Sequence, residues 1–348
     1  MFEACMDTPL EYKIGQMFIV GFSGGAMSDE LRSYLVDYNV GGVILFNKAF
    51  GEKESNIHNP QQVNTLISDI KSVSPMLPFI SVDQEGGNVA RLNPDNGFPA
   101  TPSHQALAQL SASCQYREAK TISTMLVDSG FNFNFAPVVD VNVNPLNPII
   151  AGKERSFSAD PAVVADCANI YMTAARDSGI ISSIKHFPGH GSSIGDSHLG
   201  FVDITDTYKE HELSPFRTLI ANGYSDTVMI AHVFNRNVDP IYPASMSKSF
   251  ISDLLKDELG FKGVAISDDL GMKALANHWS TEQILVNAVN AGTDLLIYSN
   301  NLGATYDRDY VKSAIDIVKR NVENGTIAQS RIDDAYDRIM DLKDKLIR

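Results

Sequence analysis

Side chains that can donate, accept or hold protons come directly after several short apolar runs of this sequence. Asp83 and Glu85 follow the run at 78–82, and Asp268 and Asp269 follow the run at 263–267. The full set is Asp83, Glu85, Asp140, Arg155, Lys185, His186, His190, Asp196, His198, His232, Asp268, Asp269 and Asp294. We expect these groups to converge on a site for a polar, hydroxylated small molecule, with acid and base groups at hand.

Asp268 is the strongest candidate for a reacting carboxylate. It ends an apolar run in the string Ile266-Ser267-Asp268-Asp269, and a carboxylate on a rigid strand end can be aimed at a reacting carbon within the tolerance that catalysis needs. The alternative is that Asp268 caps the following helix. Because two neighbouring aspartates can divide these functions, we assign the structural one to Asp269.

Asp196 and His198 lie two residues apart in a segment with glycines at 189, 191, 195 and 200. A carboxylate bonded to an imidazole orients the ring and raises its proton affinity, which makes the pair a candidate acid and base. The alternative is a surface loop whose histidines (His186, His190 and His198) only mimic a metal site. We expect no metal, because no cysteine or carboxylate spacing completes a zinc site.

Eight apolar, β-rich runs alternate with helical patterns along the chain. The runs span 17–22, 41–46, 78–83, 131–141, 180–187, 227–233, 263–269 and 293–299. Helices are expected at 28–38, at 60–73 after Asn59, from Pro161 after Asp160, at 246–259 and 282–291, and as two segments within 310–348 split at Asn324-Gly325. Solidly apolar strands are typical of a parallel sheet covered on both faces.

This alternation predicts an α/β fold, a single (β/α)8 barrel over residues 1–348 with C-terminal helices from about 310. A doubly wound open sheet is the competing fold, but it favours GxGxxG after the first strand. The string GFSGGAMS that follows residues 17–20 does not fit that motif. In a barrel, the polar residues noted above would lie at the carboxyl ends of the strands, where barrel enzymes place their chemistry.

Composition narrows the class of protein. The 348 residues include 28 Lys+Arg and 42 Asp+Glu, for a net charge of −14, with 44% hydrophobic residues. This amino-acid composition is typical of a globular protein, and the negative net charge argues against nucleic acid as a partner. The three cysteines (Cys5, Cys114, Cys167) suggest no disulfide framework.

The sequence has no apolar run long enough for a membrane span and no signal-like start. A cytoplasmic location is therefore expected. A periplasmic or extracellular protein from which a signal had been removed is the alternative. Oligomeric state is left open.

Six motifs together resemble glycoside hydrolase family 3, and more narrowly its bacterial β-N-acetylglucosaminidases of the NagZ type. They are VDQEGGNVAR from Val82, APVVDVN from Ala136, RSFS from Arg155, KHFPGHGSSIGDSH from Lys185, VMIAHV from Val228 and ISDDLGM from Ile266. The resemblance extends from about Ile14 to Leu296 and implies a (β/α)8 barrel, in agreement with the strand count. Asn88 stands where the family often has Arg, whereas the downstream Arg91 is kept.

The resemblance implies a retaining exo-β-N-acetylglucosaminidase that works by double displacement without a cofactor. In that reaction Asp268 is the nucleophile, and His198 is the general acid and base with Asp196 as its partner. The implied substrate-binding residues are Asp83, Arg91, Arg155, Lys185 and His186, with Met272 as an apolar wall. The implied substrates are small carbohydrates, N-acetylglucosamine-containing muropeptides from peptidoglycan or chitobiose-like sugars.

Two other functions stay open. A β-N-acetylglucosaminide phosphorylase could use the same site, because a neutral histidine repels phosphate less than a carboxylate does. A carbohydrate-binding protein without turnover is the second, although Asp196, His198 and Asp268 argue against it. Since the chain ends after the eighth run and its helices, we expect the acid to come from the barrel's own loops.

Overall fold

The fold was obtained as a computed structural model, which describes residues 8–49, 54–195, 200–301 and 306–347. Eight parallel strands form the barrel in the order β11-β9-β7-β6-β3-β2-β1-β12. Their bounds are β1 Phe18–Val20, β2 Gly42–Ile44, β3 Phe79–Val82, β6 Phe133–Asn134, β7 Ile181–Phe187, β9 Thr227–Ile230, β11 Val264–Ser267 and β12 Leu296–Tyr298. A parallel bridge between Ile266 and Leu295 links the first and last strands of this order and brings the barrel near closure. The α/β barrel expected from the sequence is confirmed.

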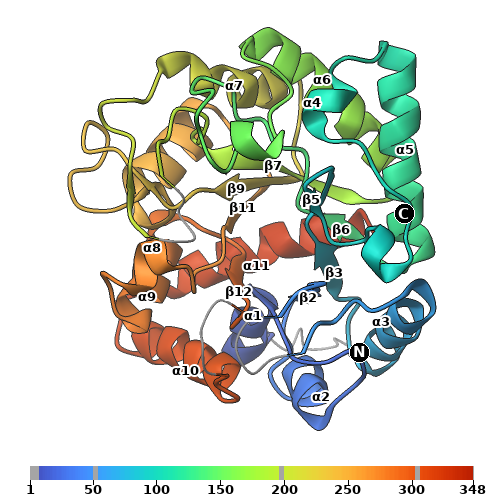
Figure 1. Cartoon of the computed structure of the whole chain (residues 1–348). Coiled ribbons are helices and arrows are strands. Elements are labelled where there is room, and N and C mark those ends of the chain that lie inside the picture. Colours follow the sequence, from blue (N-terminus) through green and yellow to red (C-terminus); the bar gives the residue numbers. More distant parts are fainter. Residues whose placement is uncertain (1–7, 50–53, 196–199, 302–305, 348) are drawn as a thin grey trace, which may run out of the picture.

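Helices surround the strands (Figure 1). The longer ones are α2 Asp29–Val36, α3 Pro60–Val73, α5 Ala112–Asp128, α6 Pro161–Arg176, α7 Ser214–Ala221, α9 Thr281–Ala291, α10 Tyr310–Glu323 and α11 Gln329–Asp344. Short helices are α1 Leu10–Gln16, α4 His104–Leu107 and α8 Lys273–Ala276, and 3-10 turns are η1 Pro94–Asn96, η2 Ala151–Lys153, η3 Glu210–Leu213 and η4 Ala244–Met246.

The predicted helix starts are confirmed by their caps. Asn59 accepts a hydrogen bond from the Gln62 amide, and Asp160 accepts one from the Ala162 amide, each just before a proline at the first helical position. The segment expected as one helix at 246–259 differs, because it divides into η4 and the π-helix η5 Ser249–Glu258. Nothing in the local sequence signals the wider hydrogen-bond register.

The fourth run, 131–141, is a strand only at Phe133–Asn134. Pro137 has no amide hydrogen to donate, but the carbonyls of Ala136 and Pro137 still accept from the amides of Ser183 and Lys185, at 3.0 and 3.3 Å. The Val139 amide then donates to the Lys185 carbonyl at 2.7 Å, so hydrogen bonds to β7 continue beyond the short strand. Two small ladders complete the strands at the carboxyl ends: β4 Gln84–Gly86 with β5 Val89–Ala90, and β8 Val202–Asp203 with β10 Val233–Phe234.

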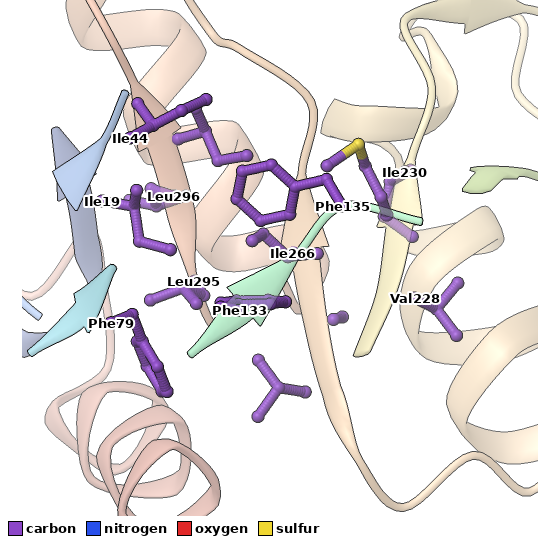
Figure 2. Close-up of a cluster of buried hydrophobic side chains, with 14 of the residues drawn as sticks. Ile19, Ile44, Phe79, Phe133, Phe135, Val228, Ile230, Ile266, Leu295 and Leu296 are labelled. Carbon is purple, nitrogen blue, oxygen red and sulfur yellow. The ribbon is translucent and has the colours of Figure 1, made fainter. Parts of the chain in front are cut away.

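Apolar side chains from the strands fill the barrel (Figure 2). Phe133 lies between Phe79 and Phe135, with ring centroids 5.4 and 4.8 Å away. The other labelled residues of this interior are Ile19, Ile44, Val228, Ile230, Ile266, Leu295 and Leu296, all buried. A packed interior leaves the strand ends as the places where a ligand can bind.

Helix α11 crosses the amino-terminal end of the barrel, behind the strands in Figure 1. Its Lys343 ammonium donates to the Gln16 side chain at 2.7 Å and lies 5.0 Å from the centre of the Phe79 ring. Burial lowers the pKa of Lys343 to about 7. The helices of the described residues include none that is long and apolar enough to cross a membrane.

Asp294 lies at this amino-terminal end, and the expectation that it belongs to the polar rim was wrong. It precedes β12 and bonds to Lys256 at 2.8 Å, to Arg331 of α11 and to the Ala265 amide at 2.9 Å. The physical reason is strand direction, since a residue at the start of a parallel strand lies at the opposite end from residues that follow the strands. We call Lys256, Asp294 and Arg331 the Asp294 cluster.

Candidate active site at the carboxyl ends of the strands

Four charged side chains form one ion-paired network at the carboxyl ends of β3 and β7. Glu85 is at its centre, 1% exposed. Its carboxylate accepts two hydrogen bonds from Arg155, 2.7 Å from Nε and 2.8 Å from Nη2, and lies 2.7 Å from the Lys185 ammonium. Lys185 also donates to Asp83 at 2.8 Å. We call Asp83, Glu85, Arg155 and Lys185 the Glu85 network.

The charges in this network hold one another ionised. Burial opposes ionisation of Glu85, but Arg155 and Lys185 outweigh it and keep the pKa of Glu85 well below its usual range. The pKa of Asp83 is lowered in the same way by Lys185 and Arg91, and the two carboxylates raise the pKa of Lys185 against its burial. The network is therefore two anions and two cations at neutral pH.

Asp83 is the member that reaches solvent, with a side chain 19% exposed. Arg91 approaches it from the β5 side, with Nη2 3.6 Å from Oδ2, and its guanidinium lies 5.7 Å from the centre of the Phe46 ring. Asn88 is exposed and donates to the Lys153 carbonyl at 3.3 Å. The substitution at 88 thus leaves the Arg91–Asp83 contact in place.

His186 connects the network to Asp140. Arg155 Nη2 lies 3.0 Å from His186 Nε2, and His186 Nδ1 lies 2.6 Å from Asp140 Oδ2. Because arginine only donates, Nε2 accepts, and Nδ1 carries the proton that it donates to Asp140. The other Asp140 oxygen accepts from the amides of His186 and His190. Asp140 thus fixes the tautomer and plane of His186.

His190 braces the loop that leaves β7. Its Nδ1 lies 2.6 Å from Ser193 Oγ, and burial lowers the pKa of His190 to about 4. Glu212 of η3 secures the same loop from behind, by accepting from the amides of Ser192 and Lys209, each at 3.0 Å. Burial raises the pKa of Glu212.

Asp268 and Asp269 leave β11 with different surroundings. Asp268 is partly exposed and accepts from the Asp269 amide at 2.8 Å. Asp269 is buried, accepts from the Gly271 amide at 2.9 Å and from the Ser299 hydroxyl, and burial raises its pKa. These bonds tie the end of β11 to the end of β12. Asp269 is thus structural, but it does not cap the following helix as expected, because α8 begins after Met272 without a side-chain cap.

His232 and Met272 support the same turn. His232 Nε2 donates to the Asp269 carbonyl at 2.9 Å, and its Nδ1 lies 2.7 Å from Ser245 Oγ. Met272 is buried, and its amide also donates to the Asp269 carbonyl, at 3.0 Å. Asp196 and His198 lie outside the described residues.

The structure brings together Asp83, Arg91, Arg155, Lys185 and His186, and places Asp268 at the end of a strand on the same rim. The sequence analysis did not predict the functions of two carboxylates. Glu85 is the centre of the network, and Glu212 anchors a loop. The function of Glu85 could have been predicted, because Asp83 and Glu85 were both in the candidate set and residues two apart on an extended chain share a face. In the described part of the chain, no group of three His, Cys, Asp or Glu side chains could hold a metal ion.

Comparison with known proteins identifies the family. Residues 9–342 match the glycosyl hydrolase family 3 N terminal domain. The chain is 34% identical to the β-hexosaminidase of Stenotrophomonas maltophilia (strain K279a), over 81% of this chain and 82% of that protein. It is 31% identical to β-hexosaminidase A of Pseudoalteromonas piscicida, over 91% of this chain and 55% of that protein.

Among solved structures, the fold is similar to a family 3 β-N-acetylglucosaminidase from Paenibacillus sp. str. FPU-7. The TM-score is 0.89 at 35% identity, over 98% of this chain and 63% of that one. The chain therefore spans less than two thirds of the length of two of these three relatives, and more than four fifths of the Stenotrophomonas protein.

Proposed function

The chain belongs to glycosyl hydrolase family 3, the family of its β-hexosaminidase relatives, and we propose that it is itself a retaining exo-β-N-acetylglucosaminidase. It would remove N-acetylglucosamine from the non-reducing end of a β-linked carbohydrate. The finer proposal is that peptidoglycan fragments, in which this sugar is linked to an anhydro-muramic unit, are among its substrates.

The observation that carries this proposal is the Glu85 network. Its two carboxylates and two cations balance in charge, which suits an uncharged sugar better than an anion. Two of the three Lys185 donors are taken by Asp83 and Glu85, and four of the five Arg155 donors by Glu85, His186 and the Ile149 carbonyl. Among the residues that the structure describes, one N–H on each cation has no acceptor and can donate to a sugar hydroxyl or an acetamido carbonyl, and Asp83 can accept from hydroxyls.

The reaction proceeds in two displacements. The Asp268 carboxylate attacks the anomeric carbon, a carbon–oxygen bond to the enzyme forms, and the bond to the leaving oxygen breaks. His198 supplies the proton that the leaving oxygen needs, while Asp196 stabilises the charged imidazole. His198 then takes a proton from water, which attacks the same carbon and releases Asp268, so that the configuration is retained.

Positioning comes from groups that do not react. The bonds from Asp269 to Gly271 and Ser299, and from His232 to the Asp269 carbonyl, fix the turn from which Asp268 projects. A carboxylate held on a rigid turn is aimed at the carbon without further loss of entropy during the reaction. Its neighbour Asp269 is buried and holds β11 to β12, whereas Asp268 is partly exposed at the end of its strand.

A chromogenic β-N-acetylglucosaminide tests the proposed activity. We expect release of the chromophore and of free N-acetylglucosamine at a rate that added phosphate does not change, and no release by Asp268→Ala at unchanged thermal stability. Formation of N-acetylglucosamine 1-phosphate would identify a phosphorylase instead. Binding of the sugar without turnover by the unaltered chain would identify a carbohydrate-binding protein.

A further inference from the structure

Five aromatic rings form a continuous run on one side of the rim. The centroid of Phe201 lies 5.3 Å from that of Phe234 and 5.3 Å from that of His278. The His278 ring is next to Trp279 at 5.6 Å, and Trp279 is next to Tyr242 at 6.4 Å. We call these five residues the aromatic run.

Three residues of the aromatic run belong to segments beside the turn that carries Asp268. Phe234 ends β10, two residues after His232, which bonds to the Asp269 carbonyl. His278 and Trp279 follow α8, the short helix that comes directly after Met272, on the β11–β12 side of the barrel (Figure 1). Trp279 and Asp269 also line one cavity of about 340 Å³. The rings of Phe234, His278 and Trp279 therefore come from the two segments that flank the turn of the proposed nucleophile.

Part of the aromatic run is exposed to solvent, although apolar rings are usually buried when a protein folds. Phe201 is 42% exposed, and His278 is exposed as well. The contacts of Phe201 are with rings on other segments, and it directly precedes the two-residue β8–β10 ladder. It therefore contributes little to the core. Contiguous exposed apolar surface marks a binding site more often than a structural need.

The chemistry of the run fits a pyranose ring. A β-linked N-acetylglucosamine has equatorial substituents and presents axial C–H groups on both faces, which pack on the face of an aromatic ring. Asp203, two residues after Phe201, pairs with Arg236 at 3.4 Å, so the charges of these two side chains cancel. The surface therefore offers stacking rather than a charge to whatever is bound there.

We propose that the aromatic run is the subsite for the leaving group, and that it binds the second sugar of the substrate by its apolar face. This rests on the proposed function, because it places the first sugar at Asp268 and the Glu85 network. It adds that a pyranose next to the scissile bond is selected by stacking. Such a pyranose is present both in chitobiose-like sugars and in N-acetylglucosamine linked to anhydro-muramic acid.

Sugar binding to a catalytically inactive variant tests the proposed subsite, because binding does not depend on how readily the leaving group departs. Calorimetric Kd values would be measured on Asp268→Asn for N-acetylglucosamine, for chitobiose and for N-acetylglucosaminyl-anhydro-muramic acid. We expect at least one disaccharide to bind about tenfold more tightly than the monosaccharide, the gain that one aromatic contact can supply. The two disaccharides show which second sugar is preferred.

Second substitutions on the same background localise that gain. Phe201→Ala and His278→Ala should each remove most of it, Phe201→Tyr should keep it, and Val127→Ala, an exposed apolar residue on α5, should change no Kd. His278 is exposed, so its variant is expected to fold even if Phe201→Ala does not. Equal affinity for all three sugars, or a gain that survives both alanine variants, would overturn the subsite while leaving the proposed function intact. Failure of Asp268→Asn to bind any of the sugars would contradict the proposed function and the subsite with it.

Discussion

The Glu85 network and the Asp294 cluster are both made of buried carboxylates and long cations, at opposite ends of one barrel. In the Asp294 cluster the carboxylate is fully buried and is bonded by Lys256, by Arg331 and by the Ala265 amide. In the Glu85 network one carboxylate, Asp83, reaches solvent, with a side chain 19% exposed. The comparison teaches that burial and pairing alone do not separate a structural ion cluster from a binding site, whereas a carboxylate that reaches solvent at the carboxyl ends of the strands does.

The largest effect is expected at the carboxyl-end rim, from His198→Ala. General acid catalysis typically contributes about 10²–10⁴-fold, and it matters most when the departing oxygen is basic. Hydrolysis of chitobiose should therefore fall by about 10³-fold, whereas nitrophenol should appear as a rapid burst followed by slow turnover. Added azide, which needs no base, should restore the slow phase. Equal slowing of both substrates, with no burst and no response to azide, would show that His198 is not the general acid and base.

Glu85→Gln should reduce kcat/KM by about 10²-fold or more, because a small displacement of positioned groups costs that much. Arg155 and Lys185 would lose their shared counter-charge, and removing one partner of a buried ion pair also lowers the free energy of unfolding by about 3–5 kcal/mol. Kinetics normalised to folded protein and urea titrations separate the two effects. The control is Glu258→Gln, which breaks an exposed pair with Arg217 and should cost about 0–1 kcal/mol. Full activity per folded molecule of Glu85→Gln would show that the network does not position the sugar.

Asp294→Asn should change stability and not catalysis. Two cations would lose their buried counter-charge, and we expect the free energy of unfolding to fall by about 3–5 kcal/mol. The kcat/KM of the molecules that remain folded should equal that of the unaltered chain. A loss of kcat/KM in proportion to that of Glu85→Gln would mean that the two ends of the barrel are coupled, and would break the comparison.

Lys343→Met should give the smallest effect, a gain in stability that depends on pH. The unfolded chain holds the Lys343 proton up to about pH 10.5, whereas the folded chain releases it above about 7. Unfolding therefore takes up a proton between these values, so the free energy of unfolding of the unaltered chain rises with pH across that window. Methionine removes this dependence. At pH 7 the variant should be more stable by about 1–2 kcal/mol, with the difference shrinking toward pH 10.5. A constant difference across the window would contradict the assignment.

Strands and helix starts were predictable from the sequence because they depend on local patterns. The eight apolar runs each contain a barrel strand, and Asn59 and Asp160 cap helices as expected. The site was predictable where a residue follows a strand, as for Asp83 and Lys185. Asp294 was misplaced because its type fits the rim although its position, before the strand, does not.

The rest depends on contacts between distant segments. Glu85 binds Arg155, which is 70 residues away in the sequence, and Phe201 contacts His278 only because the barrel brings their segments together. Apolar and aromatic residues at such positions look like ordinary core residues in the sequence. Only the packed structure shows that Phe201 is left exposed and that Glu85 is enclosed.

Trapping of the glycosyl-enzyme tests the central claim most directly. A 5-fluoro analogue of N-acetylglucosamine with a good leaving group would be incubated with the unaltered chain, and the protein digested for peptide mass spectrometry. We predict time-dependent inactivation, protection by N-acetylglucosamine, and one sugar attached to Asp268. A label on Asp269 or on another carboxylate, or turnover of the analogue without any covalent adduct, would contradict the assignment of Asp268 as the nucleophile.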